Sequence, residues 1–449
     1  MGKYAKPGKL WALRQFNDGR IALLNRKYPM TKYPNEDESY VLTNCDGKND
    51  FSSFAFLPKH RKILNELEQM GIVECLETPC TLEKGQALQT CPNPLLTEIH
   101  WAITGNCNMN CQHCFMEAPK KRYGEVTMEQ VRHMIKEFET AGVVRVSLTG
   151  GEPLLHPHFR DIVDELCNHG ILLSQIVTNG ALLDDSLFSF LHERNLWPEI
   201  QISLDGLGTH DIMRGTKNME NDVLRGIRLA VSNDHDVSVS SLFTQKNMHT
   251  ALPTYEWIKN SGVIVWMVSR PQQMGMWQGA KTSLSTDEMA ELCLLLKERW
   301  NSDGRLFTIG LEKFYNGNAA SAVKSRESVR DYSLESYECP TTLWKLFLLP
   351  DGTLLPCTGY TGSEIANDMP NINKENLSKI WTDSKLRCFV CRQKKDRLSK
   401  IPECASCEYF KECGAGCGAF ALTENGSLYA PDPFMCALYK GGYKNKFSD

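Results

Sequence analysis

The chain has 449 residues, of which 42% are hydrophobic and 23% charged, and its net charge is -4. This composition is typical of a globular protein with a buried core and excludes collagen-like and disordered classes. No basic excess indicates nucleic-acid binding, and no apolar run reaches the roughly 18 residues of a membrane span. Without an apolar signal region, we expect a cytoplasmic protein that binds neither nucleic acid nor membrane.

The first 90 residues predict a small module. Two short apolar runs, Lys9–Phe16 and Arg20–Asn25, flank an Asn-Asp-Gly turn typical of a hairpin. A helix is expected over Leu57–Met70 from its i, i+3, i+4 apolar spacing, followed by the strand Ile72–Glu74. Hairpin, helix and strand together predict a winged-helix-like module, and Thr78–Pro94 is expected to be a linker.

From residue 97 to residue 270, strand patterns alternate with helical patterns, within a domain expected over residues 97–300. Thr127–Thr140 is the clearest helix, with Thr127 and Gln130 as a capping box. Six β–α units in series predict an α/β fold, a partial (β/α)6 barrel with its helices outside. The strands are expected at Glu98–Thr104, Arg145–Thr149, Ser174–Thr178, Glu199–Leu204, Val237–Phe243 and Val263–Ser269.

The last third of the chain is less regular. Residues 301–338 are expected to be a polar connector, and residues 339–449 a Cys- and Gly-rich domain. The best helical pattern there is Asn376–Cys388, with Leu377, Ile380 and Trp381 on one face. Because so little regular core is available, such a region usually needs metal or disulfide staples. The chain holds 18 cysteines, and clustered cysteines in a cytosolic protein favour metal or catalysis.

Cys107, Cys111 and Cys114 occupy the loop after the first barrel strand. Thiolates are preferred ligands of iron–sulfur clusters, and three of them leave one iron of a 4Fe–4S cube open. The alternative is a zinc knuckle with His113 as the fourth ligand. The position at the carboxyl end of a barrel strand, where active sites collect, favours the cluster.

Polar segments that contain glycine lie at the carboxyl ends of the barrel strands that follow. Gly150 and Gly151 would let the backbone approach a ligand closely, and the carboxylate of Glu152 would bind a cationic amine. Taken alone, this segment could be a simple turn. The pattern repeats, however, and predicts a small-molecule cofactor site whose further candidate residues are Asn179, Ser203, Asp205 and Arg214.

The cysteine motif followed by Gly150-Gly151-Glu152 resembles the radical S-adenosylmethionine (SAM) superfamily over residues 97–300. The resemblance implies that SAM chelates the open iron and is cleaved reductively to a 5′-deoxyadenosyl radical, which abstracts hydrogen from a substrate. It also implies an electron donor such as flavodoxin or ferredoxin. According to this resemblance, Glu152 would hold the SAM amino group and Arg214 would bind the SAM carboxylate. Ser203 with Asp205 or Asn179 would contact the ribose.

Seven later cysteines exceed the four ligands of a zinc ribbon. Their order resembles the SPASM extension of radical SAM enzymes, which holds two auxiliary 4Fe–4S clusters and would bring the total to three. The resemblance assigns Cys339, Cys357 and Cys417 to the first auxiliary cluster, and Cys404, Cys407, Cys413 and Cys436 to the second.

The sequence departs from this pattern twice. No further cysteine lies between Cys339 and Cys357, so one iron is expected to be open or to be filled by Cys388 or Cys391. Formylglycine-generating relatives carry an Asp base directly after the second cysteine of this region, where this chain has Thr358. The cysteines outside the cluster motifs are expected to be structural: Cys45, Cys75, Cys80, Cys91, Cys167, Cys293 and, unless they bind iron, Cys388 and Cys391.

These patterns favour an oxidoreductase of the radical SAM/SPASM type that modifies a ribosomally made precursor peptide by thioether or carbon–carbon crosslinking. The module at residues 1–90 resembles leader-peptide-binding domains, which take up a peptide as an added strand, or it is a packing cap. The Trp266–Trp277 stretch lines a substrate cavity or belongs to the core. The alternatives are oxidation or decarboxylation of a small molecule such as a porphyrin, and an iron–sulfur electron carrier, which would need no cofactor pocket.

Overall fold

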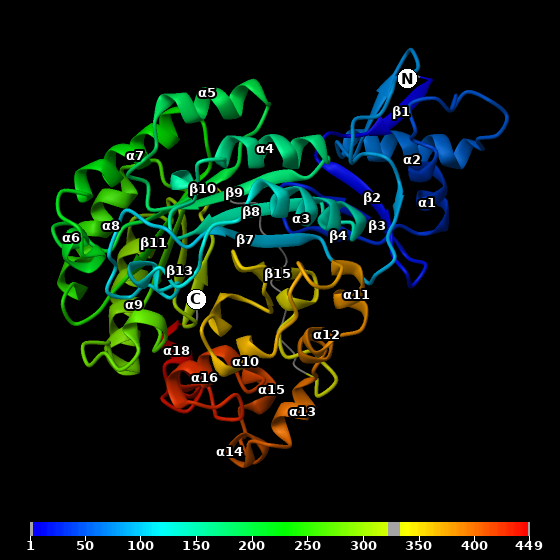
Figure 1. Cartoon of the computed structure of the whole chain (residues 1–449). Helices are drawn as coiled ribbons and strands as arrows, with labels where there is room; N and C mark the ends of the chain where they lie inside the picture. The colour runs from blue at the N-terminus through cyan, green and yellow to red at the C-terminus, as the bar shows by residue number, and fades with distance from the viewer. Residues whose placement is uncertain (1–2, 322–332, 448–449) are drawn as a thin grey trace.

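A ten-stranded sheet forms the centre of the computed structural model, which describes residues 3–321 and 333–447 (Figure 1). Seven neighbouring strands run parallel in chain order, and the sheet stays open. The six predicted strands are confirmed, and with them the α/β class and the partial barrel. The parallel strands are β7 (Glu98–Thr104), β8 (Arg145–Gly150), β9 (Leu172–Thr178), β10 (Glu199–Ser203), β11 (Val237–Leu242), β12 (Val265–Ser269) and β13 (Thr308–Leu311).

Amphipathic helices cover the outer face of the parallel strands. In α3 (Met128–Thr140), four apolar residues at helical spacing are buried, and Thr127 and Gln130 form the predicted capping box. Figure 1 shows α4, α5 and α7 on one side of the sheet and the C-terminal domain on the other. The other helices of the barrel are α4 (Phe159–Asn168), α5 (Asp185–Glu193), α6 (His210–Arg214), α7 (Glu220–Ser232), α8 (Ala251–Lys259) and α9 (Thr286–Ser302).

The predicted connector at residues 301–338 is wrong in its first part. Residues 308–317 form β13 and the antiparallel strand β14 (Tyr315–Gly317). Ile309 and Leu311 are fully buried, but this apolar run is too short to stand out among its polar neighbours. Residues 322–332 of the predicted connector lie outside the described residues.

The C-terminal domain extends the barrel sheet on its other edge. Strand β15 (Lys345–Leu348) pairs in parallel with β7, so that Lys345 lies opposite Glu98, and β16 (Leu354–Leu355) pairs with β15. The sequence does not indicate this pairing, because β15 lies far along the chain from its partner. The sheet therefore continues from the barrel into the cysteine-rich domain.

Short helices make up the rest of that domain. The predicted helix Asn376–Cys388 is two helices, α11 (Leu377–Thr382) and α12 (Lys385–Val390), because Ser384 caps a new helix with its side chain. Leu377, Ile380 and Trp381 are buried on one face, as predicted. The other helices are α10 (Glu364–Asn367), α13 (Lys394–Leu398), α14 (Pro402–Ala405), α15 (Phe410–Cys413), α16 (Gly418–Asn425), α17 (Pro433–Tyr439) and α18 (Lys444–Phe447).

The N-terminal module contains the predicted hairpin, helix and strand. The hairpin strands β2 (Trp11–Gln15) and β3 (Ile21–Asn25) belong to a sheet of order β4-β3-β2-β6, and α2 (Pro58–Gln69) packs beside it. The strand β5 (Val73–Leu76) pairs with β1 (Tyr4–Pro7) rather than with the hairpin. The predicted linker contains the two-residue strand β6 (Gln89–Thr90), and β4 is Thr31–Lys32.

One helix of this module, α1 (Glu36–Thr43), was not predicted. Its signal is a capping box of Asn35 and Glu38, each of which hydrogen-bonds the backbone N–H of the other at 2.9 Å. Among the described helices of the whole chain, none is both long enough and apolar enough to cross a bilayer.

A buried ion group joins the N-terminal module, the barrel and the C-terminal domain. Glu98, at the start of β7, lies 2.6 Å from the Nε atom of Arg145 and 2.5 Å from the Nζ atom of Lys345. Arg145 also donates to the carbonyl oxygens of Asn25 and Tyr28 in the module, at 2.8 and 2.9 Å. Burial raises the pKa of Glu98, but the charges of Lys345 and Arg145 outweigh it and hold that pKa below its ordinary value.

Replacing Arg145 by Leu should lower the free energy of unfolding by about 3 kcal/mol, because the mutation removes one of the two cations that pair with the buried Glu98. The measurement is urea denaturation followed by circular dichroism. Arg20→Leu is the matched control, since Arg20 pairs with Asp18 at 2.6 Å on the surface and should contribute less than about 1 kcal/mol. Equal losses in the two variants would contradict a structural role for the buried group.

Candidate active site

The cysteine loop at the carboxyl end of β7 is held against α6. The backbone N–H groups of Asn110 and Gln112 donate to the carbonyl oxygens of Arg214 and Met213, at 3.0 and 3.2 Å. Burial raises the pKa of Cys107 to about 12, and the nearby thiols of Cys111 and Cys114 add to the rise. The structure therefore brings the three predicted cysteines together.

Gly150 and Gly151 seat this loop on β8. A Cβ atom at Gly151 would lie 2.2 Å from the carbonyl oxygen of Asn106, and one at Gly150 would lie 2.4 Å from that of Thr104. Gly150 also has a φ of +150°, which L side chains rarely adopt. We expected these glycines to admit a ligand, whereas their closest neighbour in the structure is the cysteine loop. They are needed because two backbone segments touch here.

Glu152 is fully buried and links the ends of β8 and β9. Its carboxylate accepts hydrogen bonds from the Asn179 N–H and the Thr178 hydroxyl, both at 2.8 Å, and from the Leu154 N–H at 3.1 Å. Burial raises the pKa of Glu152 to about 7 although these hydrogen bonds oppose the shift. None of these hydrogen-bond donors is a cation. The Glu152 carboxylate could therefore pair with a cation placed beside it.

Asn179 connects the end of β9 to the cysteine loop. Its side-chain Nδ2 atom donates to the Oδ1 atom of Asn108 at 2.7 Å and lies 4.0 Å from the Sγ atom of Cys107. Ser203, the last residue of β10, is half-buried at the same rim. Both residues thus lie on the side of the sheet where the predicted cofactor would bind.

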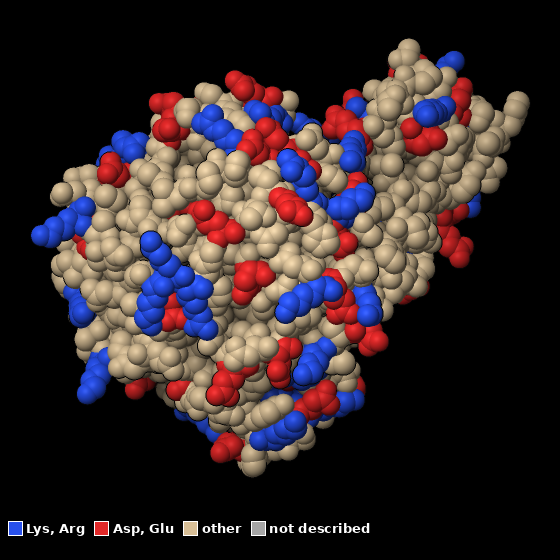
Figure 2. Space-filling view, viewed as in Figure 1, with Lys and Arg blue, Asp and Glu red and all other residues tan. Residues whose placement is uncertain are grey.

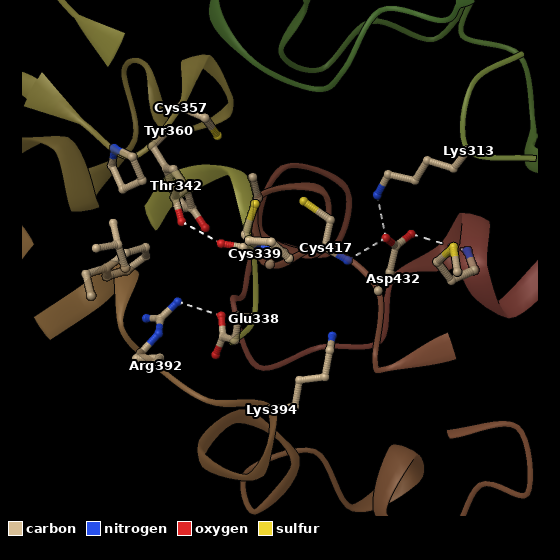
Figure 3. Close-up of a pocket in the computed structure, with 18 of the residues that line it drawn as sticks. Lys313, Glu338, Cys339, Thr342, Cys357, Tyr360, Arg392, Lys394, Cys417 and Asp432 are labelled. Carbon is tan, nitrogen blue, oxygen red and sulfur yellow. Dashed lines mark hydrogen bonds and ion pairs between the residues drawn. The ribbon is translucent and has the colours of Figure 1, made fainter. Parts of the chain in front are cut away.

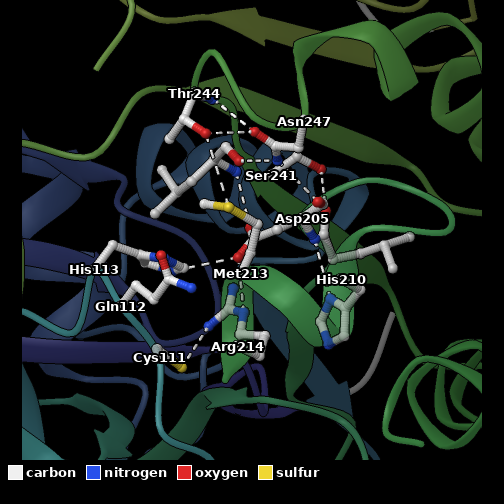
Figure 4. A network of polar contacts seen from close by, with 12 residues as sticks. Cys111, Gln112, His113, Asp205, His210, Met213, Arg214, Ser241, Thr244 and Asn247 are labelled. Carbon is white, nitrogen blue, oxygen red and sulfur yellow. Dashed lines mark hydrogen bonds and ion pairs between the residues drawn. The ribbon is translucent and has the colours of Figure 1, made fainter. Parts of the chain in front are cut away.

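Asp205 and Arg214 form a buried ion pair beside Cys111 (Figure 4). The Oδ2 atom of Asp205 lies 2.8 Å from the Nε atom of Arg214 and 3.3 Å from the Nε2 atom of His113. Arg214 Nη1 in turn lies 3.6 Å from the Sγ atom of Cys111. Burial opposes ionisation of Asp205, but Arg214 and His113 hold the pKa of Asp205 below its ordinary value. Both charges are paired within the protein, so a SAM carboxylate placed at Arg214 would share the guanidinium with Asp205.

His113 faces this ion pair rather than the three thiols. Burial lowers the pKa of His113 to about 4, so the ring is neutral near pH 7. Residues 3–321 and 333–447 contain no group of three Cys, His, Asp or Glu side chains arranged to hold a single metal ion. The thiolates of an iron–sulfur cube each bind a different iron and do not meet at one point.

The C-terminal domain contains a cavity of about 290 Å³ whose wall includes Cys339, Cys357 and Cys417 (Figure 3). The Cys417 N–H donates to Asp432 at 2.9 Å, and Lys313 pairs with the same carboxylate at 2.5 Å. The three cysteines assigned to the first auxiliary cluster therefore surround one space.

Two cysteines considered as a fourth ligand do not line this cavity. Cys388 is exposed, and Cys391 packs against the main core. The sequence could not exclude them, because their neighbours Phe389, Val390 and Arg392 do line the cavity.

The four remaining cluster candidates line a second, smaller space of about 30 Å³: Cys404, Cys407, Cys413 and Cys436. The thiols of Cys436 and Cys407 both contribute to the raised pKa of Cys404, whose main cause is burial. Cys413 lines both cavities, so the two spaces are adjacent. Among the cysteines expected to be structural, Cys45, Cys91 and Cys293 are buried.

A chamber of about 200 Å³ separates the cysteine loop from the first C-terminal cavity. Its wall includes His113 and Phe115 from the loop, Arg270 after β12, and Thr358 from the C-terminal domain. The Trp266–Trp277 stretch was predicted to line a substrate cavity or to belong to the core. Arg270 and Met274 line the chamber, whereas Trp266 is buried in the core. Prediction from sequence missed Glu312, which lines the chamber from within the supposed connector.

Two family models match the chain. A radical SAM superfamily model matches residues 101–258, and an iron–sulfur cluster-binding domain model, SPASM, matches residues 339–408. The AdoMet-dependent heme synthase of Methanosarcina barkeri is 25% identical over 353 residues, 77% of this chain and 97% of the relative. Mycofactocin maturase MftC of Mycobacterium tuberculosis is 24% identical over 345 residues, 74% of this chain and 81% of the relative.

Among solved structures, Streptococcus suis SuiB bound to the precursor peptide SuiA has a similar fold. The TM-score is 0.66 at 14% identity, covering 96% of this chain and 99% of SuiB. The likeness supports the arrangement of the N-terminal module, barrel and C-terminal domain. Since the two family models also match in the predicted order, this chain belongs to the radical SAM superfamily of enzymes and carries a C-terminal SPASM domain, with SAM and iron–sulfur clusters as its cofactors.

Proposed function

We propose that this enzyme modifies a ribosomally made precursor peptide, forming a thioether or carbon–carbon crosslink. The observation that carries the proposal is a groove in the N-terminal module, at the β4 edge of its four-stranded sheet. The groove has a volume of about 360 Å³, and its apolar wall comes from Leu23, Leu42, Ile63, Leu67 and Met70. Barrel chemistry by itself requires no such groove.

The groove suits an extended peptide segment with one apolar face. An edge strand leaves backbone N–H and C=O groups unpaired, and a peptide added as a further strand would satisfy them. Lys32, Glu38 and Glu66 also line the groove, where they would contact the polar side of the segment. The names of similar proteins agree with a peptide substrate, since MftC is a maturase and SuiB was solved with a precursor peptide.

The cysteine groups fit three 4Fe–4S clusters. Soft thiolates are the donor type such clusters require, and each group lies in its own loop or cavity. Cys107, Cys111 and Cys114 would hold the SAM-binding cluster. Bound SAM supplies the 5′-deoxyadenosyl radical after reduction by a donor such as flavodoxin or ferredoxin.

The protein residues at the rim would bind and orient SAM. We infer that Glu152 holds the SAM amino group beside Gly150 and Gly151, and that Asn179 and Ser203 contact the ribose. Arg214 would orient Cys111 and attract the SAM carboxylate by its charge, while Asp205 fixes the guanidinium. Asp205 is therefore a positioning residue in this proposal.

A second candidate is oxidation or decarboxylation of a small molecule such as a porphyrin. It is favoured by the AdoMet-dependent heme synthases, because the match to the Methanosarcina barkeri enzyme covers 97% of that relative. In that case the N-terminal module would be a packing cap, and changes in its groove would not affect turnover.

The iron content tests the cluster proposal. Three clusters should give about 12 iron atoms per chain after anaerobic reconstitution. Replacing Cys404, Cys407, Cys413 and Cys436 together by Ala should lower this to about eight, measured by iron and sulfide determination. Cys388→Ala is the matched control and should leave the iron content unchanged, since Cys388 is exposed and outside the cavities. About four irons in the wild type would contradict the two auxiliary clusters.

Substitution in the groove tests the substrate class. Met70→Asp and Ile63→Asp should each raise KM for the full precursor peptide at least about tenfold, about 1.4 kcal/mol of binding free energy, with kcat nearly unchanged. Peptide modification is followed by mass spectrometry. Leu57→Asp is the control, because Leu57 is 51% exposed on the same module but does not line the groove.

A core peptide without its leader should be insensitive to these changes. Unchanged KM for the full precursor in both groove variants would reject leader recognition by this groove. Turnover of a porphyrin-type substrate by an enzyme that modifies no precursor peptide would establish the second candidate instead.

A further inference from the structure

Glu312 has an unusual backbone conformation at the carboxyl rim of the barrel. It directly follows β13 and has a φ of +48°, in the left-handed region that side chains other than glycine rarely occupy. Its N–H donates to the carbonyl oxygen of Val268 at 2.7 Å, which helps to hold this conformation. Seven other non-glycine residues in the described part of the chain have a positive φ, and such strained conformations are concentrated at functional sites.

Glu312 also lies at the boundary between two cavities. It lines the 200 Å³ chamber beside His113 and Phe115 of the cysteine loop. It equally lines the 290 Å³ cavity that contains Cys339, Cys357 and Cys417. Among the described residues, no other lines both spaces. The residue is half-buried, because part of its side chain faces these cavities.

The nearest cations pair with other carboxylates. Arg270 Nη2 lies 2.7 Å from Glu424, and Lys313 Nζ lies 2.5 Å from Asp432. Glu312 instead accepts the backbone N–H of Arg270 at 3.0 Å. Burial raises the pKa of Glu312 to about 7, and this hydrogen bond and the two cations only partly oppose the rise. A carboxyl group of this kind can exchange a proton near neutral pH.

Thr358 lines the same chamber as Glu312. The residues that the C-terminal domain contributes to the chamber wall, Thr358, Gly359 and Phe420, include no carboxylate, whereas Glu312 at the end of β13 supplies one. We propose that Glu312 is the catalytic base, accepting the proton that the substrate releases as its new bond forms.

The role of Glu312 rests on the proposed crosslinking function, in which a carbon C–H and a second group X–H form a C–X bond. The hydrogen atom leaves the carbon to the 5′-deoxyadenosyl radical and yields 5′-deoxyadenosine. The X–H proton goes to Glu312, and the freed lone pair of X forms the C–X bond with the carbon radical. One electron remains, and it goes to an oxidised auxiliary 4Fe–4S cluster, which is reduced.

Glu312→Gln tests the step, because Gln keeps the shape and cannot accept the proton. With a precursor peptide deuterated at the reacting carbon, the variant should still transfer deuterium to 5′-deoxyadenosine, while crosslinked product falls at least about 100-fold. Glu312→Asp should recover part of the loss. Glu375→Gln is the control, since Glu375 pairs with Lys379 on the surface at 2.8 Å.

The pH profile adds a second signature. Since the base must be ionised, crosslinking by the wild type should rise with pH through a midpoint near 7, and the variant should lack this rise. The charged or titratable groups around Glu312 come from several elements: Arg270 after β12, Lys313, Cys293 of α9, His113 of the cysteine loop, and, across the cavity, Glu338, Cys339, Cys357, Tyr360, Arg392, Lys394, Cys413, Cys417 and Asp432.

Infrared difference spectra between pH 6 and pH 8 give a readout independent of turnover. Between these pH values the wild type should lose more protonated-carboxyl intensity than Glu312→Gln, in which Glu152, whose pKa is also about 7, still titrates. An unchanged crosslinking rate in the variant, absence of this band difference, or joint loss of deuterium transfer and crosslinking would overturn the proposal. If the wild type modifies no precursor peptide, the proposed function fails, and the infrared titration still decides whether Glu312 can act as a base.

Discussion

The arrangement of the molecule depends on a buried charge at the foot of β7. Glu98 needs cationic partners because an unpaired buried carboxylate is costly, and its partners come from β8 and β15. Arg145 extends the contact to carbonyl oxygens of the N-terminal module. The N-terminal module, the barrel and the C-terminal domain thus meet at the amino end of β7. The cysteine loop follows the carboxyl end of the same strand.

At the carboxyl end, the loop is held by contacts that leave little freedom. Gly150 and Gly151 permit backbone contact on one side, and α6 receives loop N–H groups on the other. Arg214 then connects Cys111 to the buried Asp205. On the face in view in Figure 2, acidic and basic side chains are interspersed. The residues of the candidate site and its cavities lie in the interior, between the barrel rim and the C-terminal domain.

Local sequence patterns predicted the features that depend on local physics. The capping box at Thr127, the alternation of strands and helices, and the cysteine motifs each depend on residues close together in the chain. Long-range features escaped prediction. The pairing of β15 with β7 depends on residues far apart, and β13 is only four residues long. Glu312 was missed for the same reason, because the two cavities that it lines are formed by segments far apart in the chain and no local motif marks it.

The sequence also could not show which groups the residues of the candidate site contact. Asp205 and Arg214 stand at strand and helix ends where ligand contacts are common, yet each has the other as its nearest opposite charge. Likewise, a pair of glycines before Glu152 has the same appearance in sequence whether a ligand or another backbone segment lies against it.

The position of β15 affects how the chain folds as it leaves the ribosome. Lys345 follows Thr104, the last residue of β7, by 241 positions, so the hydrogen-bonding edge of β7 has no strand partner on that side during most of translation. At about 5–20 residues per second, this interval lasts roughly 10–50 seconds. An unpaired apolar edge is a template for association with other chains. The edge of β7 is therefore covered only when the last quarter of the sequence, which begins with β15, has been made.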